Sequence, residues 1–190
     1  TMQGQSALSI ESARRVVANV RVEQVQAFPT VEFFRTVPLL SLVRFGRWDD
    51  ILREPHPHEG FIFAKSVWHY ARGVAYAAKG EGDLAIGELD ALVPLQDDVS
   101  VRFLDSRDYP GSLLVGIAIE LLRGEIAYRS GSYLQAITHF SAAVEQQDSL
   151  PYTEPPFWYY PTRQSLGAAM MASGDAQGAE AVFRRDLELY

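Results

Sequence analysis

The chain has 190 residues, of which 47% are apolar, and its 17 Lys and Arg against 24 Asp and Glu give a formal net charge of −7. This composition is typical of a folded globular domain, and an acidic balance without a basic block argues against duplex nucleic acid as a partner. No apolar run reaches the roughly 18 residues of a bilayer span, so we expect no membrane partner. Without cysteine there are no disulfides and no thiolate chemistry. We expect a cytoplasmic location, and the periplasm stays open.

A spaced template recurs along the chain. Its small first residue is followed at fixed steps by a bulky residue, a glycine, a second small residue and a second bulky residue. Full copies start at Gly73, Gly124 and Gly167, a weaker copy starts at Leu39, and a half-copy surrounds Gly4. The unequal spacing between copies comes from two segments rich in loop-forming residues, 97–112 and 148–157.

The apolar spacing inside each copy is helical. We expect the inner glycines to end the first helix in the left-handed conformation, and the polar residues that follow to cap the second helix. These glycines are Gly46, Gly80, Gly131 and Gly174, and the caps are Asp49, Asp83, Ser132 and Asp175. The small residues should let two helices approach closely, with Leu89, Phe140 and Phe183 filling the space beside them. The pattern therefore predicts a row of antiparallel helix pairs.

This template resembles the tetratricopeptide repeat, a helix–turn–helix unit with small, aromatic, Gly, Ala and Phe positions at these steps. The resemblance is strong at 124–144 (GEIAYRSGSYLQAITHFSAAV) and 167–187 (GAAMMASGDAQGAEAVFRRDL) and good at 73–92. It is partial at 39–53, where Pro55 falls inside the expected second helix and leaves its length open. The runs LVRFGRWDDIL, WHYARGVAYAAKG and PYTEPPFWYYPTRQSLGAAM are also similar to a group of large bacterial tetratricopeptide-repeat proteins without an assigned reaction.

The resemblance implies an all-α fold, a right-handed superhelical array (α-solenoid) of about four and a half units that forms one domain over residues 1–190. The expected units are a half unit at 4–28 and full units at 30–55, 60–96, 111–147 and 157–190. Such arrays usually end in a polar capping helix. Since this pattern lacks one, we expect a fragment of a larger bacterial protein, or ends that are covered by self-association.

The concave face of such an array is built mainly by the first helix of each pair, and we expect it to bind a protein or peptide segment. The side chains expected on this groove are Phe33, Thr36, Leu40, Arg44, Val67, Tyr70, Val74, Leu121, Glu125, Tyr128, Arg129, Arg163, Gln164 and Met171. The planar fork of an arginine suits a carboxylate, either a peptide C-terminus or an acidic side chain. The alternative is that Arg129 simply pairs with Glu125, one helical turn away.

The segment 150–161 (LPYTEPPFWYYP) carries four aromatic residues in a row after two prolines. The prolines indicate an extended entry, and Pro156 could occupy the first turn of the next helix. Trp158 and Tyr159 are therefore further candidates for contact with a partner. The alternative is that they anchor a long insert against the neighbouring helix pair.

Catalytic and metal signatures are weak. His56, His58 and His69 could supply imidazole ligands to a metal, but their spacing matches no firm signature. The chain lacks a hydrolase elbow, a phosphate-binding Gly-Lys loop and a His-Glu-x-x-His pair. We expect no enzyme and no cofactor. The expected function is an interaction scaffold; the alternatives are a structural self-association module, with the groove filled by inserts or a neighbouring chain, and a metal-dependent module at the three histidines.

Overall fold

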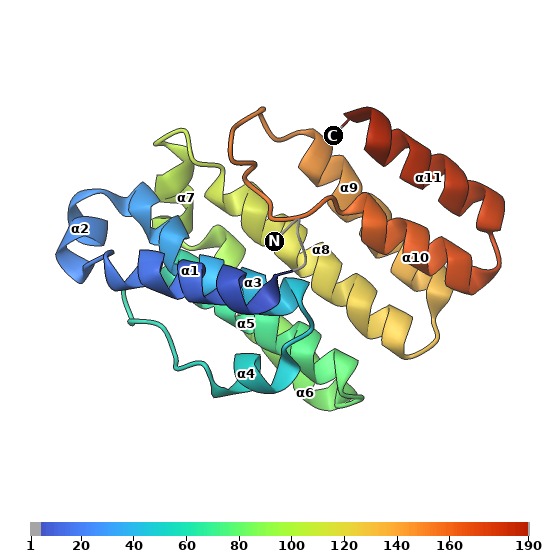
Figure 1. Cartoon of the computed structure of the whole chain (residues 1–190), viewed down its shortest axis with the longest axis horizontal. Coiled ribbons are helices and arrows are strands. Elements are labelled where there is room, and N and C mark those ends of the chain that lie inside the picture. The colour runs from blue at the N-terminus through green and yellow to red at the C-terminus, as the bar shows by residue number, and fades with distance from the viewer. Residues whose placement is uncertain (1–4, 190) are drawn as a thin grey trace.

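The computed structural model describes residues 5–189, and this range contains helices and no strand (Figure 1). The elements are α1 (Ser6–Ala18), α2 (Val22–Ala27), the 3₁₀ helix η1 (Pro29–Arg35), α3 (Val37–Arg44), α4 (Trp48–Arg53), α5 (Ile62–Ala78), α6 (Gly82–Leu92), the 3₁₀ helix η2 (Val93–Asp97), α7 (Val99–Asp105), α8 (Gly111–Arg129), α9 (Tyr133–Asp148), α10 (Arg163–Ser173) and α11 (Ala176–Leu189). The all-α prediction is confirmed. Gly4, the glycine of the expected half unit, lies outside the described residues.

The helices pack against their neighbours in chain order. Helix α5 packs on α6 and α8, α9 lies between α8 and α10, and α10 packs on α11. Figure 1 shows this succession from the blue N-terminal helices to the red α11 at the opposite side of the molecule. The larger of two apolar clusters in the described residues runs through the pairs and includes the fully buried Tyr70, Leu114 and Leu121; the smaller one contains Val25, Phe61 and Ala64.

The glycine turns lie where the template predicts them. Gly46, Gly80, Gly131 and Gly174 have φ angles of 64°, 80°, 80° and 92°, a region that a side chain with a Cβ rarely adopts. The capping prediction holds at Asp175, whose Oδ1 accepts a hydrogen bond of 2.8 Å from the Gly178 N–H. It is wrong for the other three pairs, because α4, α6 and α9 begin without a side-chain cap.

The small residues lie at close helix crossings, with one change from the expected partners. A Cβ on Gly124 would come within 2.4 Å of the Phe140 ring, and a Cβ on Gly167 within 2.4 Å of the Phe183 ring, as the template predicts. At Gly73 the close neighbour is Leu122 of α8, at 2.5 Å, rather than Leu89. The lack of a side chain at Gly73 therefore allows α8, the first helix of the next pair, to approach α5 closely, instead of α6.

Several expected boundaries change. In the 30–55 unit the first helix is divided into η1 and α3, and α4 is only six residues long and ends before Pro55. The 97–112 insert is not all loop, because it contains α7. Residues 157–162 are not helical, and α10 begins at Arg163. The prediction that Pro156 starts this helix is thus wrong; the chain passes a further proline, Pro161, before it turns helical.

Candidate functional site

The first helices of four pairs meet around one small cavity of about 180 Å³. Arg44 comes from α3, Tyr70 from α5, Leu121 and Glu125 from α8, and Ser165 from α10. We call the surface formed by these four helices the inner face. Tyr70 and Leu121 occupy the same register, three residues before Gly73 and Gly124, and both side chains line this cavity.

Residues 150–161, which we call the strap, lie across the inner face. The Trp158 side chain is only 3% exposed, and its ring lies 5.7 Å from the ring of Tyr70, centroid to centroid. The Tyr159 hydroxyl is 3.1 Å from the Tyr70 hydroxyl, and the Phe157 ring meets Tyr109 edge-on at 5.5 Å. In this structure Trp158 and Tyr159 therefore anchor the strap on the domain, the arrangement that the sequence left as the alternative to partner contact.

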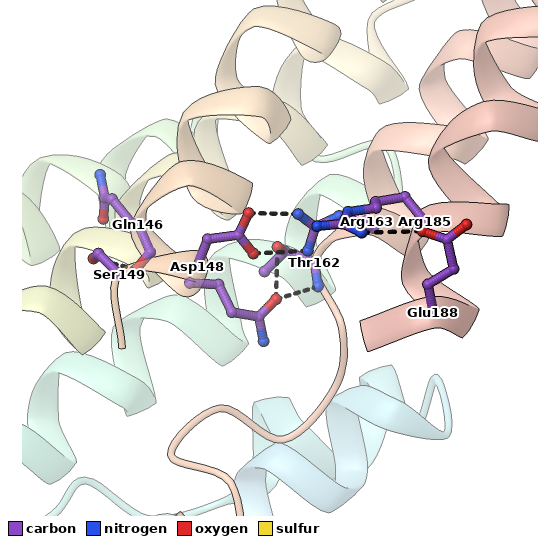
Figure 2. Close-up of polar contacts among 8 residues, drawn as sticks. Gln146, Asp148, Ser149, Thr162, Arg163, Arg185 and Glu188 are labelled. Atoms are coloured by element: carbon purple, nitrogen blue, oxygen red, sulfur yellow. Dashed lines mark hydrogen bonds and ion pairs between the residues drawn. The ribbon is translucent and has the colours of Figure 1, made fainter. Parts of the chain in front are cut away.

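A buried polar cluster closes the base of the strap, where α9 ends and α10 begins (Figure 2). The Oε1 atom of Gln147 accepts hydrogen bonds from the Thr162 N–H at 2.7 Å and from its hydroxyl at 2.8 Å, and Gln147 Nε2 donates to the Tyr160 carbonyl at 3.1 Å. Beside it, both terminal nitrogens of Arg163 contact the two carboxylate oxygens of Asp148. Such a two-pronged pair fixes the relative position of the two helix ends.

Arg44 joins the first and last of the four helices across the cavity. It is exposed on α3, and its Nη1 donates a hydrogen bond of 3.0 Å to Gln164 Oε1 on α10. Its guanidinium also lies 5.6 Å from the centre of the Tyr160 ring. A guanidinium has five N–H donors in a planar fork, so Arg44 gives the rim of the cavity a directional positive charge.

Tyrosine hydroxyls surround the cavity. Burial raises the pKa of Tyr70 and of Tyr159 well above the ordinary value, and the negative charge of Glu125 adds to both shifts. Burial also raises the pKa of Tyr160 to about 12, against the hydrogen bond that its hydroxyl makes with Ser165 at 3.0 Å. These hydroxyls therefore stay protonated at neutral pH and can both donate and accept hydrogen bonds.

The structure divides the expected groove residues into three groups. Half of them are buried, namely Thr36, Leu40, Val67, Tyr70, Val74, Leu121 and Arg163. Phe33, Glu125, Tyr128 and Gln164 are half-buried, and Arg44, Arg129 and Met171 are exposed. Those that line the cavity are Arg44, Tyr70, Val74, Leu121 and Glu125.

Three of the predicted residues have roles that differ from groove contact. The hydroxyl of Thr36 donates to the Phe33 carbonyl at 2.8 Å within its own turn. Arg163 belongs to the strap base and not to the groove margin. Arg129 Nε lies 2.8 Å from Glu125 Oε1, as in the alternative of a local pair. Tyr160 and Ser165 also line the cavity but are not among the predicted residues, although Tyr160 is the last of the four consecutive aromatic residues at 157–160.

The three histidines do not come together. His56 and His58 are exposed in the loop before α5, where each contacts an aromatic ring, Trp68 and Phe61 respectively. His69 Nδ1 lies 2.7 Å from Glu88 Oε2, so its imidazole is engaged by a carboxylate. Within residues 5–189 no group of three metal-ligating side chains converges.

Comparison with known proteins finds no matching family model, no matching curated protein and no matching solved structure. Among the described helices, none combines the length and the apolar character that crossing a membrane requires.

Proposed function

We propose that this chain is an interaction scaffold of the tetratricopeptide type, a right-handed superhelical stack whose inner face binds a peptide segment of another protein. The template, the glycine turns with positive φ and the close crossings at Gly124 and Gly167 support this proposal. The inner face offers apolar walls and separated charges rather than a nucleophile beside a base, so binding is the role that we assign to it. A cytoplasmic location stays part of the proposal.

The observation that carries the proposal is the convergence of four helices on the cavity between Arg44 and Glu125. The cavity is walled by Tyr70 and Leu121, and its two charges lie on different helices. A peptide end fits this chemistry, because a carboxylate can pair with Arg44 while a neighbouring N–H group faces Glu125. We therefore propose a ligand with a free C-terminal carboxylate and an apolar last side chain.

The test is selection of peptides from a library displayed with free C-termini, followed by fluorescence anisotropy with the purified chain. Arg44→Ala should weaken binding at least tenfold, as expected for a central charged anchor, and amidation of the peptide C-terminus should have a similar effect. Arg184→Ala is the control, since this exposed arginine pairs with Glu180 on α11, away from the inner face. Peptides that bind equally well to the wild type and the Arg44→Ala variant would contradict the proposal.

Self-association is a second candidate, and the exposed surface of α11 favours it. Leu187 is 83% exposed, and Phe183 and Leu189 on the same helix are also exposed. A second copy could cover these side chains by continuing the stack. Light scattering over a hundredfold range of concentration tests this candidate: the mass should rise for the wild type and not for Leu187→Glu. A constant mass for both would exclude it.

A further inference from the structure

The strap occupies the place where the repeat architecture puts a bound peptide. Its aromatic run covers Tyr70, a residue expected to face a ligand, and leaves only the small cavity beside Arg44. The contacts are those that a peptide would make, with ring packing by Trp158 and a hydroxyl contact from Tyr159 to Tyr70. The inner face is thus already filled by a segment of its own chain.

The fit between the strap and the inner face is incomplete. The Nε1 atom of Trp158 and the hydroxyl of Tyr109 are both buried without a hydrogen-bond partner. Buried polar groups are nearly always paired, so each of these atoms lowers the net stability of the strapped state and would gain a partner from water if the strap lifted. Trp158 lies in the strap and Tyr109 packs against its Phe157, so both unpaired atoms belong to side chains at this contact.

The anchoring of the strap also allows it to open. Its base is held by Gln147 with Thr162 and by Asp148 with Arg163, contacts that join α9 to α10 without the side chains of the aromatic run. Within the strap, residues 150–156 form no regular structure, and Tyr152 is 86% exposed. The contacts that hold α9 against α10 would therefore remain in place if the aromatic run left the inner face.

We propose that the strap is a built-in competitor for the inner face, and that the partner is a protein segment with consecutive aromatic side chains next to proline, which takes the place of Trp158 and Tyr159. This inference rests on the proposed function, because it names the partner chemistry of the same face. Aromatic side chains with polar tips suit this surface, since Tyr70 offers both a ring and a hydroxyl.

The experiment uses a synthetic fluorescent peptide with the sequence of residues 150–161, LPYTEPPFWYYP. Trp158→Ala combined with Tyr159→Ala removes the two strap side chains that contact Tyr70 and so partly empties the face, and this double variant should bind the peptide at least tenfold more tightly than the wild type does. Tyr152→Ala, an exposed strap substitution, is the matched control and should bind as weakly as the wild type. A double variant that is folded by circular dichroism and binds no more tightly than the wild type would overturn the inference.

A second measurement on the unaltered face decides the matter if the double variant does not fold. The chain is labelled with 5-fluorotryptophan, and the Trp158 resonance is assigned from Trp158→Phe. Excess peptide should shift the Trp158 resonance toward the position of solvent-exposed tryptophan and leave that of Trp68, which is stacked on Arg72, unchanged. A Trp158 resonance that does not respond to the peptide overturns the proposal.

The two proposals fail in different ways. Binding of the strap peptide to the emptied face, with no library peptide that depends on Arg44, would support the built-in competitor and contradict the carboxylate ligand. Library peptides that depend on Arg44, with no binding of the strap peptide to the folded double variant, would do the reverse.

Discussion

His69 on α5 and Glu120 on α8 occupy the same position in two successive helix pairs, each four residues before the small residue that starts the template. Each contacts the residue 19 positions later: His69 Nδ1 lies 2.7 Å from Glu88, and His139 Nδ1 lies 2.7 Å from Glu120. The acid and the imidazole have therefore exchanged helices between the two pairs. The same pairing is made twice, with opposite polarity.

An arginine completes each pair from the same register. Arg72 Nε donates to Glu88 at 2.7 Å, and Arg123 Nη1 donates to Glu120 at 2.6 Å. Each arginine stands directly before the small residue that starts the template, Gly73 or Gly124. Burial alone would raise the pKa of Glu88, but the hydrogen bonds and charges of His69 and Arg72 outweigh it and lower the pKa. The carboxylate is thus ionised and bound by two partners.

This exchange predicts that the α5–α6 pair can also carry the acid on its first helix and the histidine on its second, as the α8–α9 pair does. Glu88→Ala should lower the free energy of unfolding by about 2 kcal/mol, because it leaves partly buried donors without an acceptor. The double variant His69→Glu with Glu88→His, which reverses the pair, should be more stable than Glu88→Ala and recover most of the loss. In this variant Arg72 can bind the new carboxylate at position 69 on its own helix, as Arg123 binds Glu120 on α8. Urea denaturation measures both. A reversed variant as unstable as Glu88→Ala would show that the two pairs are not equivalent.

The close crossing of α8 and α9 gives a second prediction. Gly124→Ala should cost about 2 kcal/mol of unfolding free energy, because the new Cβ meets the ring of Phe140. Phe140→Leu in the same chain should restore part of this loss, since leucine is the residue that the α5–α6 pair carries at this position. Gly87→Ala in α6 is the matched control: apart from its chain neighbours and the backbone of its own helix, no atom lies within 4 Å of its new Cβ, so it should stabilise the chain by about 0.5–1 kcal/mol. Equal destabilisation by both alanines would contradict the crossing.

The features that the sequence predicts well are local ones. A left-handed glycine depends on the conformation of a single residue, and the crossing at Gly124 depends on a fixed step to Phe140, so both could be found from spacing alone. Contacts between helices that are far apart in the sequence could not be found in this way. The hydrogen bond from Arg44 to Gln164 spans 120 positions, and no periodicity in the sequence specifies it.

The strap shows the same limit at the candidate site. Its aromatic run stands out in the sequence, but the run is compatible both with partner contact and with packing on the domain. The path of the chain back over Tyr70 is what selects packing, and Gln147 and Arg163 at the base place the two ends of this path next to each other. Neither residue is distinctive in sequence, because a buried glutamine or arginine has no local pattern.

The strap base offers a matched pair of neighbouring glutamines for a third prediction. Gln147→Ala removes the acceptor of Thr162 and the donor to Tyr160, and should lower the free energy of unfolding by about 2 kcal/mol. Gln146→Ala should cost less than about 1 kcal/mol, because the buried Oε1 of Gln146 has no hydrogen-bond partner. Thermal or urea denaturation compares the two variants. A cost for Gln146→Ala that equals that of Gln147→Ala would mean that the base network does not stabilise the fold.

The last prediction concerns pH and the start of α5. Glu32 is buried, and its Oε1 accepts a hydrogen bond of 2.7 Å from the Ala64 N–H, in the first turn of that helix. Burial raises the pKa of Glu32 from its usual 4.5 to about 7, although the N–H groups of Ala64 and Phe63 and the charge of Arg35 oppose the shift. The folded chain therefore holds this proton more tightly than the unfolded chain does.

A raised pKa of this kind favours folding below the unfolded value and loses its contribution as pH rises through the folded value. The unfolding free energy of the wild type should thus fall relative to Glu32→Gln between about pH 4.5 and 7, by up to about 3 kcal/mol. Glutamine keeps the acceptor for Ala64 but does not titrate, so the difference between the two chains isolates Glu32 from all other carboxylates. Urea denaturation at several pH values measures this difference. A difference that stays constant, or that grows in favour of the wild type as pH rises, would mean that Glu32 is ionised in the folded chain throughout this range.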